Sequence, residues 1–228
     1  RKENKIYRPL PHATERYADV FRRLGFKISL PLVGDVALGQ DKAPVPETEQ
    51  TTPRQTSLAV DSVVKIGFAP FAKHAAKMYS LDKFKEIVQY FDRAPYQLYF
   101  FGGKGAERLL LADWEGYFSR AVPMSSSSSI EEELEIMREM RAMVTMDSAN
   151  MHLASLVNVP VISLWGPTHP YAGFYGFRQD PLNAVQVNLS CRPCSVFGNT
   201  SCWRGDHACM QQITPSLVEE KILKVLKG

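Results

Sequence analysis

The chain has 228 residues, of which 45% are hydrophobic and 22% are charged, proportions that are ordinary for a globular protein. They exclude collagen-like, coiled-coil and wholly disordered proteins, and no apolar run approaches the roughly 18 residues that a membrane-spanning helix needs. The net charge of +3 is too small to indicate nucleic acid as the main partner. The sequence begins with Arg1 and not with an initiator Met, and it shows no signal-peptide pattern. We therefore expect that Arg1 is not the natural start of the protein.

Positive charge is concentrated near the N-terminus. Residues 1–30 hold eight Lys or Arg and three Asp or Glu. Apolar residues three or four positions apart predict a helix over residues 12–25. The basic side chains of this helix would suit peripheral contact with an anionic membrane surface, or they form an ordinary solvated helix face.

Residues 39–60 are rich in Gln, Thr and Pro and predict a linker or a long loop. Beyond them, strands and helices alternate along the chain. The expected strands are Ser62–Ala69, Tyr96–Phe101, Phe118–Val122, Ala142–Met146 and Val159–Leu164. The expected helices are Leu81–Phe91, Ala106–Ala112, 129–141 after a capping box at Ser129, Ala149–Val157 and Pro215–Leu226.

The alternation fixes the expected fold class. The strands are apolar along almost their whole length, which is typical of a parallel sheet covered by helices on both faces. We therefore predict a doubly wound, Rossmann-like α/β fold. Ligands in such folds bind beyond the carboxyl ends of the strands, so the strand-to-helix turns are the candidate sites.

The first two turns offer groups that suit a phosphate or a ribose. Lys73 and Lys77 follow the first strand, where an ammonium and a helix N-terminus could bind a diphosphate, unless they are solvated loop lysines. Gly102 and Gly103 allow close approach of the backbone to a ligand. Glu107 either accepts from a ribose hydroxyl or complements the dipole of its helix.

The next two turns bring further polar groups to the same edge of the predicted sheet. Asp147 ends a buried strand, and Asp147 or Ser148 would cap the following helix. With His152 they would form a phosphate or sugar site, or else a simple cap beside a buried histidine. Gly166 and Thr168 lie in a Gly-Pro-Thr turn, where Thr168 could donate to a phosphate.

All four cysteines lie close together in the sequence, with the spacing Cys191-x2-Cys194-x7-Cys202-x6-Cys209. Such clustering does not suggest the disulfide framework of a secreted domain. Four thiolates within so short a loop could hold a structural Zn²⁺ in tetrahedral geometry. Free thiols and disulfides remain the alternatives.

These motifs, in this order, resemble glycosyltransferase family 9, the ADP-heptose:lipopolysaccharide heptosyltransferases. The stretch at 77–80 (Lys-Met-Tyr-Ser) is similar to the family's Lys-x-Trp-Pro element. Residues 147–154 are similar to its Asp-[Ser/Thr]-Gly-x-x-His-Leu-Ala motif, and residues 164–168 to its Leu-[Phe/Tyr]-Gly-Pro-Thr turn. The cysteine-rich stretch that ends at Pro215 also occurs in the family. The resemblance covers residues 62–228 and implies the C-terminal, nucleotide-sugar-binding half of a GT-B fold.

The resemblance implies roles for the candidate residues. Lys77 and Asp147 would be catalytic, with Lys77 stabilising the departing nucleoside diphosphate and Asp147 lying at the diphosphate and the sugar. The donor would be a nucleotide sugar, ADP-heptose, and transfer would need no metal ion or other cofactor. The other donor-binding residues would be Lys73, Gly102, Gly103, Glu107, Ser128, Ser148, Ala149 (Gly in the family), His152, Gly166 and Thr168.

The family's proposed general base and its acceptor site belong to an N-terminal half, so we expect the chain to be a fragment of a longer protein. The acceptor would be a lipid-linked core saccharide at the cytoplasmic face of the bacterial inner membrane. A non-catalytic nucleotide- or sugar-binding module and a zinc-organised interaction domain are the alternative hypotheses. The expected organisation is a remnant of the N-terminal half (1–38), a linker or loop (39–60), a nucleotide-sugar-binding domain (61–212) with a cysteine-rich loop (189–211), and a C-terminal helix (213–228).

Overall fold

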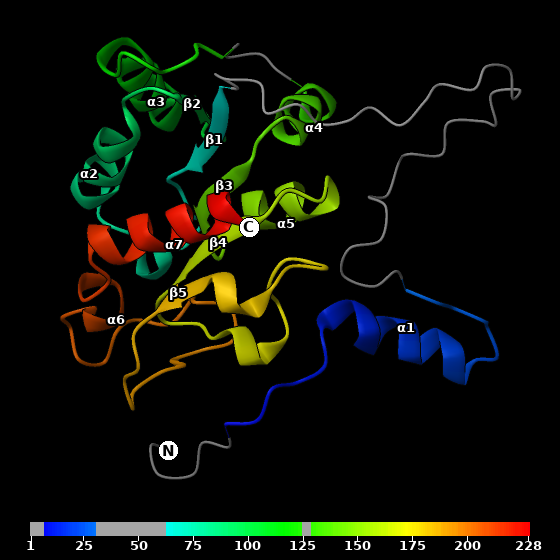
Figure 1. Ribbon diagram of the computed structural model, residues 1–228. Coiled ribbons are helices and arrows are strands. Elements are labelled where there is room, and N and C mark those ends of the chain that lie inside the picture. Colours follow the sequence, from blue (N-terminus) through cyan, green and yellow to red (C-terminus); the bar gives the residue numbers. More distant parts are fainter. Residues whose placement is uncertain (1–6, 31–62, 125–128) are drawn as a thin grey trace, which may run out of the picture.

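The computed structural model describes residues 7–30, 63–124 and 129–228. Its centre is a five-stranded parallel sheet with the order β2-β1-β3-β4-β5 (Figure 1). This arrangement confirms the doubly wound α/β fold class, because the strand order reverses direction after β1. The strands are β1 (Val64–Ala69), β2 (Tyr96–Phe100), β3 (Ala142–Met146), β4 (Val161–Trp165) and β5 (Ala184–Gln186).

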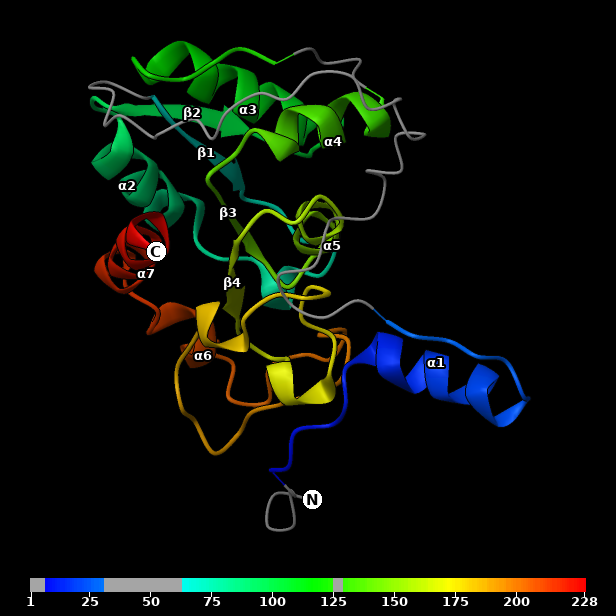
Figure 2. The ribbon, with the colours of Figure 1, turned by 45° about the vertical axis from the view of Figure 1, so that its right-hand side comes forward.

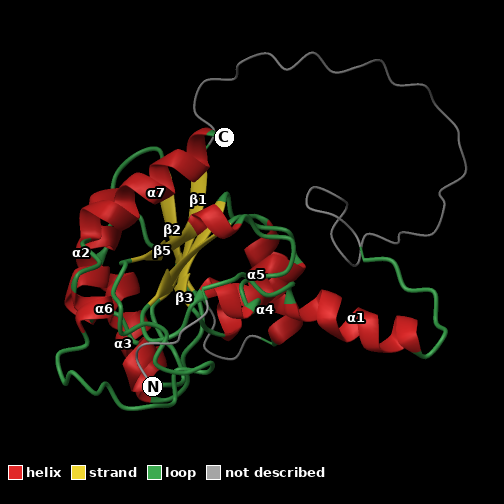
Figure 3. Cartoon of the chain, turned by 90° about the horizontal axis from the view of Figure 1, so that it is seen from below, coloured by secondary structure: helices red, strands yellow, loops and turns green. Residues whose placement is uncertain are grey.

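Helices cover both faces of the sheet, as the apolar strands required (Figures 1 and 3). One face packs against α2 (Leu81–Phe91), α3 (Ala106–Tyr117) and α7 (Pro215–Lys227). The opposite face packs against α4 (Ile130–Arg138) and α5 (Ala149–Leu156). A short helix, α6 (Ala208–Gln211), leads into α7. None of the helices in the described ranges is long and apolar enough to span a bilayer.

The larger core cluster is aromatic. Phe68 on β1 and Phe100 on β2 are essentially fully buried, and their ring centroids lie 6.1 Å apart. Phe84 of α2 stacks against Trp114 of α3 at 6.3 Å. Large rings fill the space between sheet and helices with few rotatable bonds, which makes the strand ends a rigid base for a site.

Helix boundaries are set by capping residues and by packing. The predicted capping box is confirmed, because Ser129 and Glu132 cap each other's backbone N–H groups at the start of α4. Helix α3 continues to Tyr117, beyond the predicted end at Ala112. The reason is packing: Trp114 is 4% exposed and must face the core, which extends the helix by more than a turn.

One predicted strand needs correction, and one observed strand was missed. The stretch Phe118–Val122 forms a single parallel bridge between Ala121 and Leu98 and no regular strand. Strand β5 was not predicted, since three residues are too few to show a periodic pattern. The predicted linker (39–60) lies outside the described residues, as does Ser62, the first residue of the first predicted strand.

Helix α1 (Ala13–Arg23) projects from the sheet domain (Figure 2). It is joined to the turn that follows β4, because the backbone N–H of Ala13 donates to the carbonyl of Gly173 at 2.7 Å. His12 begins the helix and its Nε2 lies 2.6 Å from the carbonyl oxygen of Tyr175. The N-terminal segment is therefore part of the described fold and lies against one of its loops.

Candidate functional site

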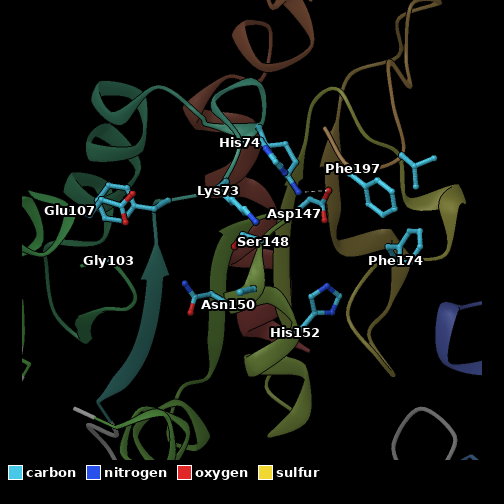
Figure 4. Close-up of a pocket in the computed structure, with 15 residues that line it drawn as sticks. Lys73, His74, Gly103, Glu107, Asp147, Ser148, Asn150, His152, Phe174 and Phe197 are labelled. Atoms are coloured by element: carbon cyan, nitrogen blue, oxygen red, sulfur yellow. Dashed lines mark hydrogen bonds and ion pairs between the residues drawn. The ribbon is translucent and has the colours of Figure 1, made fainter. Parts of the chain in front are cut away.

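A cavity of about 520 Å³ lies at the carboxyl ends of β1, β2 and β3, where the fold class predicts a ligand site (Figure 4). It brings together residues from five separate loops and from the starts of α3 and α5. Eight residues of the predicted donor site line it: Lys73, Lys77, Gly103, Glu107, Asp147, Ser148, Ala149 and His152.

A buried ion pair lies in the wall of this cavity. The Lys77 Nζ lies 3.2 Å from Oδ2 of Asp147, and both side chains are nearly buried, at 13% and 12% exposure. The hydroxyl of Thr168 donates to the same carboxylate oxygen at 2.8 Å. Asp147 thus fixes the direction of the Lys77 side chain, because the hydrogen bond from Thr168 holds the carboxylate in place.

The N-terminus of α5 opens onto the cavity. Ser148 is the N-cap residue by position, but its hydroxyl lies 3.0 Å from Oγ1 of Thr145 and no side chain of the described residues caps the helix. The prediction that Ser148 or Asp147 caps α5 through its side chain is therefore wrong. The consequence favours a ligand, since uncapped N–H groups at a helix start can donate to an anion.

His152 adds a polar group without a charge. Burial lowers the pKa of its imidazole below the ordinary value of 6.5, although the Asp147 carboxylate acts in the opposite direction. The ring is therefore neutral at pH 7 and can donate one hydrogen bond and accept another. The positive charge of the site comes from Lys73 and Lys77.

The glycine-rich turn after β2 forms the far end of the cavity. Gly103 lines it with φ of +86°, a conformation that glycine adopts without strain. Gly102 has a different role, because a Cβ there would lie 2.7 Å from Nδ2 of Asn150, and the missing side chain lets Asn150 approach. Glu107, at the start of α3, completes this end (Figure 4).

Three of the described residues predicted to bind the donor do not line the cavity: Gly102, Gly166 and Thr168. Thr168 is 1% exposed and uses its hydroxyl on Asp147, so it positions the carboxylate and does not face a ligand. Gly166 is a packing residue, because a Cβ there would lie 2.4 Å from the sulfur of Met210. Ser128 lies outside the described residues.

Sequence reasoning missed one whole wall of the cavity. Phe174, Val196 and Phe197 line it from two loops far apart in the sequence. Their only sequence signal is large apolar side chains in segments with no strand or helix pattern, and that signal does not say what the residues contact. Asn150 also lines the cavity, and its place between Asp147 and His152 in one motif is the signal that could have found it.

The structural zinc site that the cysteine spacing suggested stays a prediction. Within the described ranges, no three His, Cys, Asp or Glu side chains come together where one metal ion could bind. Cys209 is buried, and the other three are partly exposed. Burial raises the pKa of the Cys209 thiol, the positive charge of Arg192 acts in the opposite direction, and the other three thiols act in the same direction as burial.

Arg192 organises the cysteine-rich loop. Its side chain is 2% exposed, and its guanidinium donates to the backbone carbonyls of four residues and to the side chain of Gln186 at 3.0 Å. The five donors of a guanidinium make such a hub possible. The four carbonyls belong to Trp165, Gly166, Thr168 and Val187.

Comparisons with known proteins point to one family. The family model of glycosyltransferase family 9 (heptosyltransferase) matches residues 1–201. Lipooligosaccharide heptosyltransferase 2 of Haemophilus influenzae is 28% identical over 187 residues, which are 79% of this chain and 52% of that protein. The same-named protein of Campylobacter jejuni is 28% identical over 37% of the chain and 25% of its own length. The chain thus spans about half the length of the Haemophilus relative.

Solved structures share the fold. E. coli ADP-heptose LPS heptosyltransferase II superposes with a TM-score of 0.56 at 21% identity, over 75% of this chain and 48% of that chain. A family 9 glycosyl transferase from Veillonella parvula superposes with a TM-score of 0.65 at 17% identity, over 98% and 62% of the two chains. With motifs, site and family model in agreement, the chain belongs to glycosyltransferase family 9.

Proposed function

We propose that the chain binds a nucleoside-diphosphate sugar, ADP-heptose, and supplies the donor-binding part of a heptosyltransferase. The observation that carries this proposal is the Lys77–Asp147 ion pair beside the uncapped N-terminus of α5. An ammonium and several N–H donors that converge in one cavity suit a diphosphate. The solved relatives include an E. coli heptosyltransferase with ADP and with a fluorinated ADP-heptose, which supports the choice of nucleotide.

Lys77 has the main chemical role in this proposal. When the sugar leaves the donor, negative charge grows on the diphosphate, and a fixed ammonium stabilises that charge without reorganising. The N–H groups of Ser148 and Ala149 at the start of α5 add to this effect. Asp147 and Thr168 keep the ammonium aimed at the cavity, and Glu107 accepts from the ribose at the far end.

We further propose that the acceptor is a lipid-linked core saccharide of the cell envelope and that transfer takes place in the cytoplasm, at the inner face of the bacterial inner membrane. The printed names of the relatives, lipooligosaccharide and LPS heptosyltransferases, support this acceptor class. The basic residues at 1–30 are consistent with peripheral contact with anionic lipid.

Calorimetric titration of the purified chain with ADP, UDP and GDP tests the donor assignment. We expect ADP to bind and Lys77→Ala to weaken its binding roughly tenfold, which is about 1.4 kcal/mol. Lys104→Ala is the matched control, because this lysine lies at the glycine-rich turn and outside the cavity lining. Its ADP affinity should stay close to that of the wild type.

Preference for UDP or GDP would refute the ADP assignment and leave the nucleotide site in place. Failure of all three nucleotides to bind the folded chain would refute the proposed function. Equal affinities of wild type and Lys77→Ala would remove Lys77 from the phosphate site.

A further inference from the structure

One wall of the cavity is formed by the rings of Phe174 and Phe197 and by the side chain of Val196 (Figure 4). We call it the aromatic wall, and the proposed chemistry does not yet use it. Val196 is 52% exposed and Phe197 is 61% exposed. The rings of Phe174 and Phe197 lie 6.1 Å apart with their planes at 47°. Water contact with such apolar area is unfavourable, so a ligand that covers it gains free energy.

The wall is held from behind by α1. The guanidinium of Arg16 lies 5.1 Å from the ring centroid of Phe174, a cation–π contact, and it donates to the carbonyl of Ala172 at 2.9 Å. Phe174 is therefore fixed in place although it follows β4 in an irregular segment.

The wall is also joined to the phosphate-binding residues. Gly198, next to Phe197, lies against the Lys77 side chain so closely that a Cβ would be 2.6 Å from Cγ of the lysine. The loop that carries Phe197 thus contacts the stem of the residue that meets the diphosphate. A ligand bound at Lys77 has its next group within reach of these rings.

The two ends of the cavity differ in chemistry. Glu107 and Gly103 lie at one end, the aromatic wall lies at the other, and the Lys77–Asp147 pair lies between them (Figure 4). A nucleotide sugar has the same order of parts: a polar ribose, a diphosphate and a sugar ring. If ribose and diphosphate bind as proposed, the sugar ring reaches the wall.

The geometry points to the aromatic wall as the subsite that stacks on the C–H face of the donor's sugar ring. A pyranose presents C–H groups on one face and hydroxyl groups at its edge, and aromatic rings attract weakly positive C–H groups. His152 and Asp147 line the cavity beside the wall and offer polar partners for the hydroxyl edge. This assignment rests on the proposed function and adds a residue, Phe197, that binds the donor's sugar ring.

Titrations with ADP and with ADP-heptose, on wild type and Phe197→Ala, test the inference. The truncated side chain is mostly exposed, so the variant should fold. We expect ADP-heptose to bind Phe197→Ala roughly three- to tenfold more weakly and ADP to bind it within about twofold of wild type. Phe197→Tyr retains a ring and should restore the affinity. Trp203→Ala is the matched control, because Trp203 is a 58% exposed aromatic residue of the same loop that lies outside the cavity lining.

The possible failures are distinguishable. A wild-type chain that binds neither ligand refutes the proposed function and this inference with it. Normal wild-type binding with equal weakening of ADP and ADP-heptose by Phe197→Ala would place the rings at the nucleoside and overturn the inference alone. Unchanged affinities for both ligands in Phe197→Ala would overturn it as well.

Discussion

Asp147 shows how one side chain of the site depends on its neighbours. Its carboxylate is nearly buried, and one oxygen accepts hydrogen bonds from Lys77 and from Thr168. A buried charge that loses a partner costs far more than a solvated one. Lys77, which faces the cavity, therefore depends through Asp147 on Thr168, which does not face it.

Thr168→Val removes the buried hydroxyl that donates to Asp147 and keeps the side-chain shape. We expect the free energy of unfolding to fall by about 1 to 3 kcal/mol, because a buried carboxylate oxygen loses a hydrogen bond. ADP affinity should fall roughly threefold or more, because Lys77 is then less firmly directed. Urea denaturation and calorimetry measure the two effects.

Thr168→Ser keeps the hydroxyl donor and should bind ADP nearly as well as wild type. The positioning role of Thr168 would be contradicted if Thr168→Val lost stability but bound ADP with unchanged affinity. In that case the hydroxyl would contribute to folding alone.

At the scale of elements, the cysteine-rich loop between β5 and α6 has little regular structure. It is held by the hydrogen bonds of Arg192, which link it to the turn that follows β4. That turn also contains Thr168, so the loop and the Lys77–Asp147–Thr168 chain share one support.

Arg192→Met removes this support and retains apolar bulk. We expect a loss of at least about 3 kcal/mol in the free energy of unfolding, because several buried carbonyls lose their donors together. Arg204→Met is the control from the same loop. Arg204 is exposed and pairs with Asp206 two residues away, so its replacement should leave stability nearly unchanged. Equal denaturation midpoints of the two variants would contradict the hub role.

The long periodic segments made most elements predictable. Helix α2 was predicted with its observed bounds, because Phe84, Ile87, Val88 and Phe91 repeat at helical spacing and all are fully buried. Short elements such as α6 carry too few residues for a pattern. The end of α3 depends on packing of Trp114, which no local pattern reveals.

The same limit applies to the candidate site. Lys77, Asp147 and Ser148 follow strands and could be predicted from the rule that parallel sheets bind ligands at that edge. Phe174 and Phe197 reach the cavity from irregular loops, whose course depends on tertiary contacts such as those of Arg16 and Arg192. The cysteine-rich loop shows the same limit, since cysteine spacing does not reveal that a buried arginine between the cysteines holds the loop.

At the scale of the whole molecule, two histidines with lowered pKa values link stability to pH. Burial lowers the pKa of His152, and it lowers the pKa of His169 from 6.5 to about 4. Between about pH 6.5 and about pH 4, these histidines bind protons in the unfolded chain that they do not bind in the folded chain. The free energy of unfolding should therefore fall as the pH falls from about 6.5 toward about 4.

Urea denaturation at about pH 7.5 and about pH 5 measures this loss. His169→Asn isolates the contribution of one histidine, because an asparagine oxygen can replace Nδ1 as the acceptor for the backbone N–H of Tyr171. The difference in stability between the two pH values should be smaller in the variant. An unchanged difference would show that other groups cause the pH dependence.

The contact between Arg16 and Phe174 has a mechanical consequence. Helix α1 projects from the sheet domain, yet one of its side chains holds the aromatic wall and the carbonyl of Ala172. A displacement of α1 would therefore shift Phe174 and the part of the cavity wall that it forms, whereas Asp147 follows β3 directly and would stay with the sheet.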